Sequence, residues 1–236
     1  MTEELFRDDS YLKECDAVVT AVGAGGIELD RTIFYYNSGG QPGDSGILTT
    51  ADGCKVVITD TCKERGTDAL LHVPEDGAPQ LAVGDAVTAA IDWDRRHRHM
   101  RMHTCMHLLC SVIEGGVTGG SIGDGKGRID FDLPVIDLDK QAIADEINRR
   151  IEENHPVVSS WITEDEMAAN MDMVRTMSVK PPSGQGRARL INIEGVDLQP
   201  CGGTHVGFTG EIGPIRIGKI ENKGKHNRRV NILFDE

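Results

Sequence analysis

Short apolar runs separated by glycine, proline and acidic residues fill the first 92 residues of the chain. Runs of this length, rich in valine, isoleucine, threonine and tyrosine, are typical of β-strands, and their separators are typical of turns. No helical period interrupts them, so the pattern predicts a small β-barrel. The expected strands are 17–22, 27–36, 46–49, 55–60 and 86–92.

The pattern changes at Asp92. Acidic residues open a stretch that holds neither glycine nor proline until Gly115, which predicts a long helix over 92–114. A second helix is expected over 138–153, where isoleucines four residues apart mark one apolar face. Thr163 and Glu166 have the spacing of a capping box and predict the start of a third helix.

Strand patterns return in the last part of the chain. They predict strands at 188–193, 196–199, 215–220 and 229–234, with a loop at 181–186 before the first of them. The resulting fold class is α+β. We expect a small β-barrel-like domain over 1–92 that carries a glycine motif, followed by an α+β domain with an antiparallel sheet over 93–236.

Composition narrows the class of protein. With 39% hydrophobic and 27% charged residues the chain can form a core, and it shows neither a membrane-spanning run nor a secretory start, so we expect a cytoplasmic protein. Its six cysteines are widely spaced, which favours reduced thiols. The net charge of -13 argues against a general DNA-binding protein, although residues 213–234 are locally basic.

Two pairs of metal-ligating residues share the same spacing. His103 and His107 lie four apart in the expected long helix, and Cys201 and His205 repeat that separation in a glycine-containing turn. Taken singly, each is more often an ordinary histidine or a small core cysteine. Three imidazoles and a thiolate together form the tetrahedral nitrogen and sulfur set that suits Zn²⁺. We therefore expect these four residues to bind zinc, with Cys105 and Cys110 as buried thiols and His97 and His99 at the surface.

A glycine-rich segment at 32–46 is the second candidate feature. It is either an ordinary hairpin loop or a ligand contact in which Gln41 and Asp44 offer an amide and a carboxylate, and no local feature decides between the two. It matches neither a Walker loop nor a dinucleotide fingerprint.

Basic residues flank both pairs of expected metal ligands. Arginines crowd the start of the long helix, and a second basic cluster follows the Cys201 turn. A solvated charged face is the usual explanation of such runs, but their position beside the expected metal site favours an anionic substrate.

These segments resemble the alanyl-tRNA editing proteins of the AlaX family and the homologous editing domain of alanyl-tRNA synthetases. The resemblance is carried by 32–46, by the Arg-His-Met-Arg-Met-His-Thr-Cys-Met-His-Leu-Leu core within 92–109, by 199–206, and by Thr-Gly-Glu-Ile-Gly at 209–213 continuing to 223–229. The His-x-x-x-His and Cys-x-x-x-His motifs also occur in threonyl-tRNA synthetase editing domains, so the other segments favour the alanine family. The Tyr-Tyr-Asn-Ser-Gly-Gly-Gln stretch is closer to synthetase versions than to many free-standing relatives.

The resemblance implies a trans-editing hydrolase. Its substrate would be tRNA(Ala) mischarged with serine, and with glycine as a second amino acid. A synthetase pocket sized for alanine excludes bulky residues but rejects glycine or serine only weakly, which explains why a second site is needed. By the same resemblance Thr32 senses the serine hydroxyl, Gln41 contacts the substrate, and Zn²⁺ is held by His103, His107, Cys201 and His205. The residues assigned to the tRNA are Arg95, Arg96, Arg98, Lys219, Lys223, Lys225, Arg228 and Arg229.

Two other functions remain open at this stage. The same metal motifs serve enzymes that edit seryl-tRNA(Thr), and a zinc-stabilised tRNA-binding module would need no hydrolytic activity. A complete synthetase is not expected, because 236 residues leave no room for an aminoacylation domain and no ATP-binding motif is evident.

Overall fold

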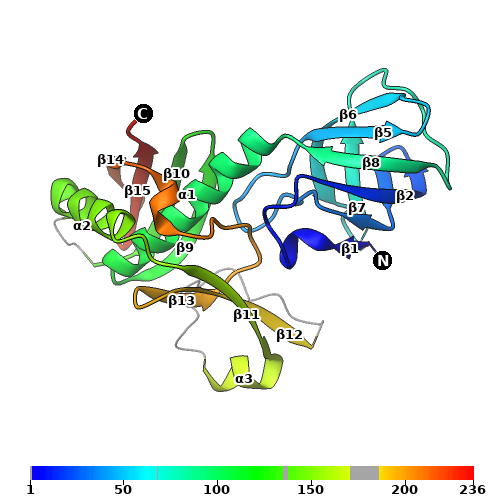
Figure 1. Ribbon diagram of the computed structural model, residues 1–236. Coiled ribbons are helices and arrows are strands. Elements are labelled where there is room, and N and C mark those ends of the chain that lie inside the picture. Colours follow the sequence, from blue (N-terminus) through cyan, green and yellow to red (C-terminus); the bar gives the residue numbers. More distant parts are fainter. Residues whose placement is uncertain (1, 68, 135–137, 171–185) are drawn as a thin grey trace. The chain divides into compact units, whose positions relative to one another are not determined.

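The computed structural model describes residues 2–67, 69–134, 138–170 and 186–236 of the chain. The chain divides into two compact units, Met1–His97 and Arg98–Glu236, and the boundary between them along the sequence falls within helix α1 (Trp93–Val112). The expected boundary after residue 92 falls just before this helix. The α+β fold class is confirmed, since antiparallel sheets dominate both units and the helices lie mainly in the second (Figure 1).

The first unit is a closed barrel with the strand order β2-β3-β7-β6-β5-β8. Alternate strand residues point inward, as in β6, where Val56 and Ile58 are fully buried between partly exposed neighbours. Leu48, Leu29 and Ala89 add to the same core. The strands of this unit are β1 (Glu3–Glu4), β2 (Glu14–Gly23), β3 (Gly26–Leu29), β4 (Arg31–Thr32), β5 (Gly46–Thr50), β6 (Lys55–Lys63), β7 (Leu70–Pro74) and β8 (Ala86–Ile91), with a 3-10 turn at Leu5–Arg7.

One expected strand is shorter than the sequence indicated. The run 27–36 is divided into β3 and β4, and strand structure ends at Thr32. Residues 33–36 continue as irregular chain although Ile33, Phe34 and Tyr35 are buried. Their burial explains the apolar pattern without a strand, because a loop that packs into a core has the same composition as a buried strand.

The second unit combines a four-stranded sheet, in the order β14-β15-β10-β9, with a three-stranded sheet, in the order β11-β12-β13. All pairings in both sheets are antiparallel. The remaining elements are β9 (Gly116–Gly123), β10 (Lys126–Asp132), α2 (Lys140–Glu152), β11 (Val157–Thr163), α3 (Glu164–Ala169), β12 (Arg187–Ile193), β13 (Asp197–Pro200), a 3-10 turn at Thr209–Ile212, β14 (Ile215–Asn222) and β15 (Asn227–Phe234). Apart from Gly186, the loop expected at 181–186 lies outside the described residues.

Helix α1 carries the histidine pair into a buried environment. Residues 102–110 of this helix are all buried, so it has no solvated face along this stretch. Met102 and Met106 lie over the β9–β10 hairpin, where a Cβ atom built on Gly127 would come within 2.9 Å of both methionine sulfur atoms. Glycine at 127 therefore permits the close approach of helix and sheet.

The two shorter helices begin as the sequence predicts. Asp139 caps α2 by accepting hydrogen bonds from the backbone of Gln141 and Ala142, and the isoleucines at 143, 147 and 151 are all buried. Thr163 and Glu166 form the expected capping box of α3. No helix in the described ranges is both long and apolar enough to cross a membrane.

Candidate metal centre

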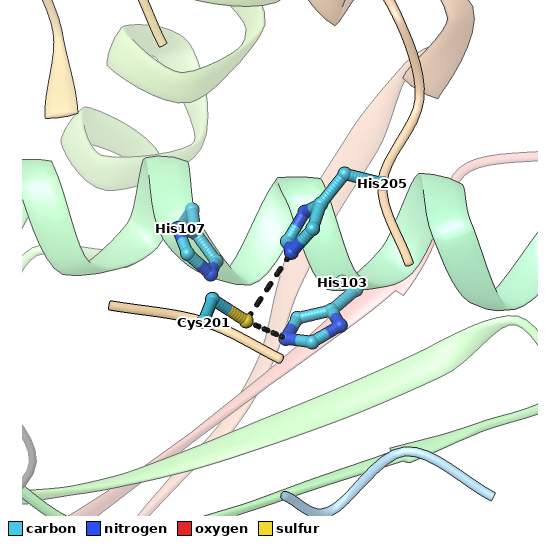
Figure 2. A group of neighbouring side chains, drawn as sticks. All are labelled: His103, His107, Cys201 and His205. Carbon is cyan, nitrogen blue, oxygen red and sulfur yellow. Dashed lines mark hydrogen bonds between the residues drawn. The ribbon is translucent and has the colours of Figure 1, made fainter. Parts of the chain in front are cut away.

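Helix α1 supplies the first half of the centre. Its 3.6-residue period places His103 and His107 on one face, with their ring centroids 5.4 Å apart (Figure 2). Both rings are at least nine-tenths buried. The uninterrupted helix therefore presents two imidazoles side by side in a region with little solvent.

The turn after β13 supplies the second half. The Cys201 backbone N–H donates to the carbonyl of Arg189, which extends the pairing of β12 and β13 by one residue. The buried Arg189 guanidinium then donates to the carbonyls of Gly203, at 2.7 Å, and Cys201, at 3.3 Å. These bonds hold the turn in a shape that directs Cys201 and His205 toward the helix.

The four side chains converge on one point. The Cys201 Sγ lies 3.5 Å from His103 Nε2 and 3.3 Å from His205 Nε2, and the donor atoms of all four residues lie within 4.8 Å of one another. Ligands of a tetrahedral zinc ion are separated by about 3.3–3.6 Å, given bond lengths of about 2.0 Å to nitrogen and 2.3 Å to sulfur. The expected set is therefore brought together at a spacing that suits a metal ion, and Cys110 is not part of it.

A threonine hydroxyl fixes the orientation of His205. Thr104 Oγ1 donates to the carbonyl of Met100, so its lone pairs accept hydrogen bonds from His205 Nδ1, at 3.1 Å, and from the Val206 backbone N–H. Nδ1 of His205 must then carry the proton. Its Nε2 consequently presents a lone pair to the centre.

A carboxylate fixes the orientation of His107. His107 Nδ1 lies 3.2 Å from Asp197 Oδ2, which can only accept from it, and 3.0 Å from Gln199 Nε2, which donates to the same carboxylate oxygen at 2.7 Å. Both Asp197 and Gln199 are buried. The proton on Nδ1 leaves the other ring nitrogen, Nε2, as the metal-ligating atom, as in carboxylate–histidine–metal arrangements.

The charges within the centre favour cation binding. Although burial alone would raise it, the pKa of the Cys201 thiol is held well below its ordinary value by the neighbouring His103 and His205 rings. Burial lowers the pKa of His107, but hydrogen bonds to Asp197 and Cys201 outweigh it and raise the value to about 9. In the absence of a metal, a proton on His107 thus balances the thiolate. A divalent cation can take the place of this proton, because thiolate and imidazole ligands bind a metal in their deprotonated form.

Thr32 and Gln41 lie in the first unit. The Thr32 hydroxyl accepts from the Phe34 backbone N–H and lies 2.8 Å from His72 Nε2, while His72 Nδ1 lies 3.0 Å from the carbonyl of Ile27. Thr32 is fully buried, and so is Gln41, whose backbone is paired with that of Ser38. Both residues therefore have structural contacts in the barrel unit.

Asp44 and Arg96 form a buried ion pair that the sequence did not suggest. The Arg96 Nε lies 2.9 Å from Asp44 Oδ2, and its terminal nitrogens donate to the carbonyls of Ser10 and Ile33 as well as to Asp44. The Tyr35 backbone N–H also donates to this carboxylate, at 2.6 Å. Asp44 thus binds an arginine of the same unit rather than a free ligand, and Arg96 has no surface position from which to reach a phosphate.

The other residues expected to contact tRNA differ in exposure. The Arg95 guanidinium donates to the carbonyl of Gly43, and Arg98 pairs with Asp124 and Glu236. In the β14–β15 hairpin, Arg228 is buried and Arg229 is paired with both oxygens of Asp130. The lysines of this hairpin, Lys219, Lys223 and Lys225, are exposed at the surface.

One histidine that was expected at the surface is buried, and three residues beside the centre were not predicted. His99 was expected at the surface but is 2% exposed, because helix α1 is buried from this point onward on most of its faces. Thr104, Asp197 and Gln199 were not predicted at all. Asp197 and Gln199 could have been found from their spacing, because residues two apart in a strand share a face and this strand ends beside Cys201.

Comparison with known proteins defines first the class of protein. Residues 188–231, which include the Cys201 turn, match the threonyl and alanyl tRNA synthetase second additional domain. Residues 5–95 match the class II (A) tRNA synthetases. Two parts of the chain thus match domains of tRNA synthetases, and Cys201 and His205 of the centre lie within the first match.

Full-length relatives then specify the family. The chain is 41% identical to the alanyl-tRNA editing protein AlaX-M of Methanosarcina acetivorans, over 98% of both chains. It is 33% identical to the AlaX-M protein of Saccharolobus solfataricus over the same shares, and 36% identical to the alanine–tRNA ligase of Thermococcus kodakarensis over 93% of this chain and 24% of the ligase. The chain belongs to the alanyl-tRNA editing protein family.

Proposed function

We propose that this chain hydrolyses the ester bond of tRNA(Ala) mischarged with serine, and with glycine as a second substrate, in the cytoplasm where tRNAs are charged. Membership of the editing protein family makes it an aminoacyl-tRNA deacylase that acts on tRNA(Ala). The observation that carries the proposal is the convergence of His103, His107, Cys201 and His205 on one buried point in a chain of this family.

We further propose that the bound ion is Zn²⁺. Imidazole and thiolate donors favour zinc over hard cations such as Mg²⁺, which prefer oxygen ligands. When bound, zinc would supply positive charge that polarises a carbonyl or a water molecule. The protein residues contribute the geometry: the helix holds two imidazoles, the Arg189-braced turn holds the thiolate and the third imidazole, and the surrounding burial keeps bulk water away.

The tRNA contact is proposed for the exposed lysines of the β14–β15 hairpin, Lys219, Lys223 and Lys225. They lie in the same unit as the centre, and Glu221 is the acidic partner of two of them. Arg96 is left out because its guanidinium is used within the barrel unit. Arg95, Arg98, Arg228 and Arg229 are less exposed than these lysines, so they rank below them as phosphate ligands.

Thr32 and Gln41 remain the proposed residues of amino acid selection, on the resemblance alone. A Thr32→Val variant separates this role from a structural one. If Thr32 senses the serine hydroxyl, hydrolysis of correctly charged alanyl-tRNA rises relative to seryl-tRNA. If the hydroxyl serves only the barrel, where it bonds Phe34 and His72, both rates change in proportion and the stability falls.

The decisive experiment is a deacylation assay on tRNA(Ala) charged with serine, glycine or alanine and on tRNA(Thr) charged with serine. Each substrate is tested with and without a zinc chelator. We expect rapid hydrolysis of seryl-tRNA(Ala), slow hydrolysis of alanyl-tRNA(Ala), and loss of activity with chelator that added zinc restores. Faster hydrolysis of seryl-tRNA(Thr) would assign the chain to threonine editing, and tight tRNA binding without hydrolysis of any ester would contradict the proposal.

A further inference from the structure

The hydrogen bonds around the four ligands decide which nitrogen of a histidine ring can bind a metal ion. A neutral imidazole carries one proton and one lone pair, and in water the proton can occupy either ring nitrogen. A ring contributes to a metal site only when the lone pair is on the nitrogen that faces the ion. Whatever fixes the proton on the outer nitrogen therefore prepares the ring for binding.

His205 is prepared by a hydroxyl that can only accept from it. Thr104 is fully buried, and its one proton is donated to the Met100 carbonyl at 3.0 Å. The oxygen is then left with acceptor positions, which are taken by His205 Nδ1 and the Val206 backbone N–H. Because Thr104 lies on α1 between the two ligand histidines, it also ties the Cys201 turn to the helix.

His107 is prepared by a carboxylate that adds charge as well as direction. Asp197 accepts from His107 Nδ1, and the Gln199 amide nitrogen, which lies 3.0 Å from the same ring nitrogen, donates to that carboxylate oxygen at 2.7 Å. A divalent ion bound to one thiolate and three neutral imidazoles would leave a net charge of about +1 in a buried site. A second negative group removes that charge, and a buried net charge is costly when it is not balanced.

We propose that Asp197 and Thr104 are positioning residues for the metal: Thr104 directs His205 by hydrogen bonding alone, whereas Asp197 directs His107 and also neutralises the occupied centre. This inference rests on the metal-binding part of the proposed function. Its consequence is an asymmetry between the two histidines. Removal of the charge at Asp197 weakens binding more than removal of the hydroxyl at Thr104.

The test measures metal affinity in the full chain without tRNA. Zinc affinity is determined by competition with a chromogenic chelator for the variants Asp197→Ala, Asp197→Asn, Thr104→Val and Thr104→Ser. Loss of an outer partner of a metal-ligating histidine lowers affinity by about 10- to 100-fold. We expect Asp197→Ala near the upper end, Asp197→Asn between it and Thr104→Val, and Thr104→Ser close to wild type, because serine keeps the hydroxyl.

Two controls separate positioning from a general loss of stability. Thr61→Val removes a buried hydroxyl that donates to the Asp44 carbonyl in the barrel unit, and Asp130→Asn removes a partly buried carboxylate paired with Arg229. Neither change should alter zinc affinity. Long-range ¹⁵N spectra of labelled histidine give a second readout, since Asp197→Ala should broaden or shift the His107 resonances and Thr104→Val those of His205.

Each outcome decides the inference. Zinc affinity equal to wild type in both Asp197→Asn and Thr104→Val would overturn it, and so would a Thr104→Ser variant as weak as Thr104→Val. If Asp197→Ala does not fold, Asp197→Asn tests the charge by itself. A wild-type chain that binds no zinc removes both this inference and the metal from the proposed function. A chain that binds zinc in the expected order but hydrolyses no ester overturns the proposed function alone.

Discussion

Both units of the molecule bury a cluster of polar side chains, but the two clusters differ in the direction of their hydrogen bonds. In the barrel unit, Arg96 brings donors and Asp44 brings acceptors, and the carbonyls of Ser10 and Ile33 accept from the remaining guanidinium nitrogens. In the second unit, three ring nitrogens and a sulfur turn toward one another, and their outer partners fix at least two of those nitrogens as acceptors.

The contrast shows that burial of polar residues does not by itself indicate function. The Asp44–Arg96 cluster is complete, because its donors and acceptors satisfy one another within the unit. The histidine and cysteine cluster holds a thiolate and a proton that a divalent cation can replace, so it is suited to bind such an ion. The first cluster is expected to stabilise the fold, and the second to bind an ion.

The largest expected effect tests the second cluster. Cys201→Ser should lose zinc, because a hydroxyl is a poor substitute for a thiolate ligand. Losing several kcal/mol of charge stabilisation corresponds to about a thousandfold slower deacylation of seryl-tRNA(Ala). Bound metal is measured by mass spectrometry, and Cys54→Ser in the barrel unit is the matched control. A metal-free Cys201→Ser variant with full activity would show that the centre is not catalytic.

The next effect tests the first cluster. Arg96→Met leaves the Asp44 carboxylate buried without its cation, which should lower the free energy of unfolding by about 3–5 kcal/mol. Trp93 is the tryptophan of the barrel unit, so fluorescence in a Trp161→Phe background reports on that unit alone. Arg31→Met, at a half-exposed ion pair, is the control and should cost about 1 kcal/mol or less. Equal losses in the two variants would contradict the structural role of Arg96.

A smaller effect concerns His72, a fully buried histidine of the barrel unit. Burial lowers its pKa from the ordinary 6.5 to about 4. The unfolded chain therefore takes up a proton between these values and the folded chain does not, so stability falls as the pH falls below 6.5. Between pH 7 and pH 5 the loss should be about 2 kcal/mol.

His72→Gln isolates this titration from that of other groups. Glutamine can both donate and accept, as His72 does between Ile27 and Thr32, but it does not titrate. Urea denaturation of wild type and variant at several pH values gives the difference, and His226→Gln at the surface is the control. If wild type and His72→Gln lose stability equally on acidification, His72 is not the source of the loss.

The sequence predicted those features that depend on local periodicity. The isoleucine period gave α2, the capping box gave α3, and the repeated four-residue spacing brought out the metal set. The β9–β10 hairpin was missed because its glycines, including Gly127 beneath two methionines, serve helix packing and weaken the strand pattern. The partners of His107 and His205 could not be predicted, because spacing does not tell which ring nitrogen faces outward.

Arg96 was predicted to contact tRNA, but its side chain is buried. It lies in a run of arginines that has the composition of a surface cluster, yet it is fully buried, whereas its neighbour Arg95 is only partly so. Composition reports the charge of a segment and not the direction of each side chain. The partner that decides the matter, Asp44, lies far away in the sequence and within a segment that itself resembled a ligand loop.

The smallest effect per residue is expected at the exposed lysines of the β14–β15 hairpin, which are solvated cations, unlike the buried Arg96. Each phosphate contact adds about 0.9 to the slope of log affinity against log salt on duplex nucleic acid. Changing Lys219, Lys223 and Lys225 together to glutamine should therefore weaken tRNA binding and reduce this slope by about 2 to 3, while zinc content stays unchanged. Lys55→Gln, an exposed lysine of the barrel unit, is the control for charge alone. A slope equal to that of wild type would move the tRNA contact away from this hairpin, to cations such as Arg98 that are paired in the free protein.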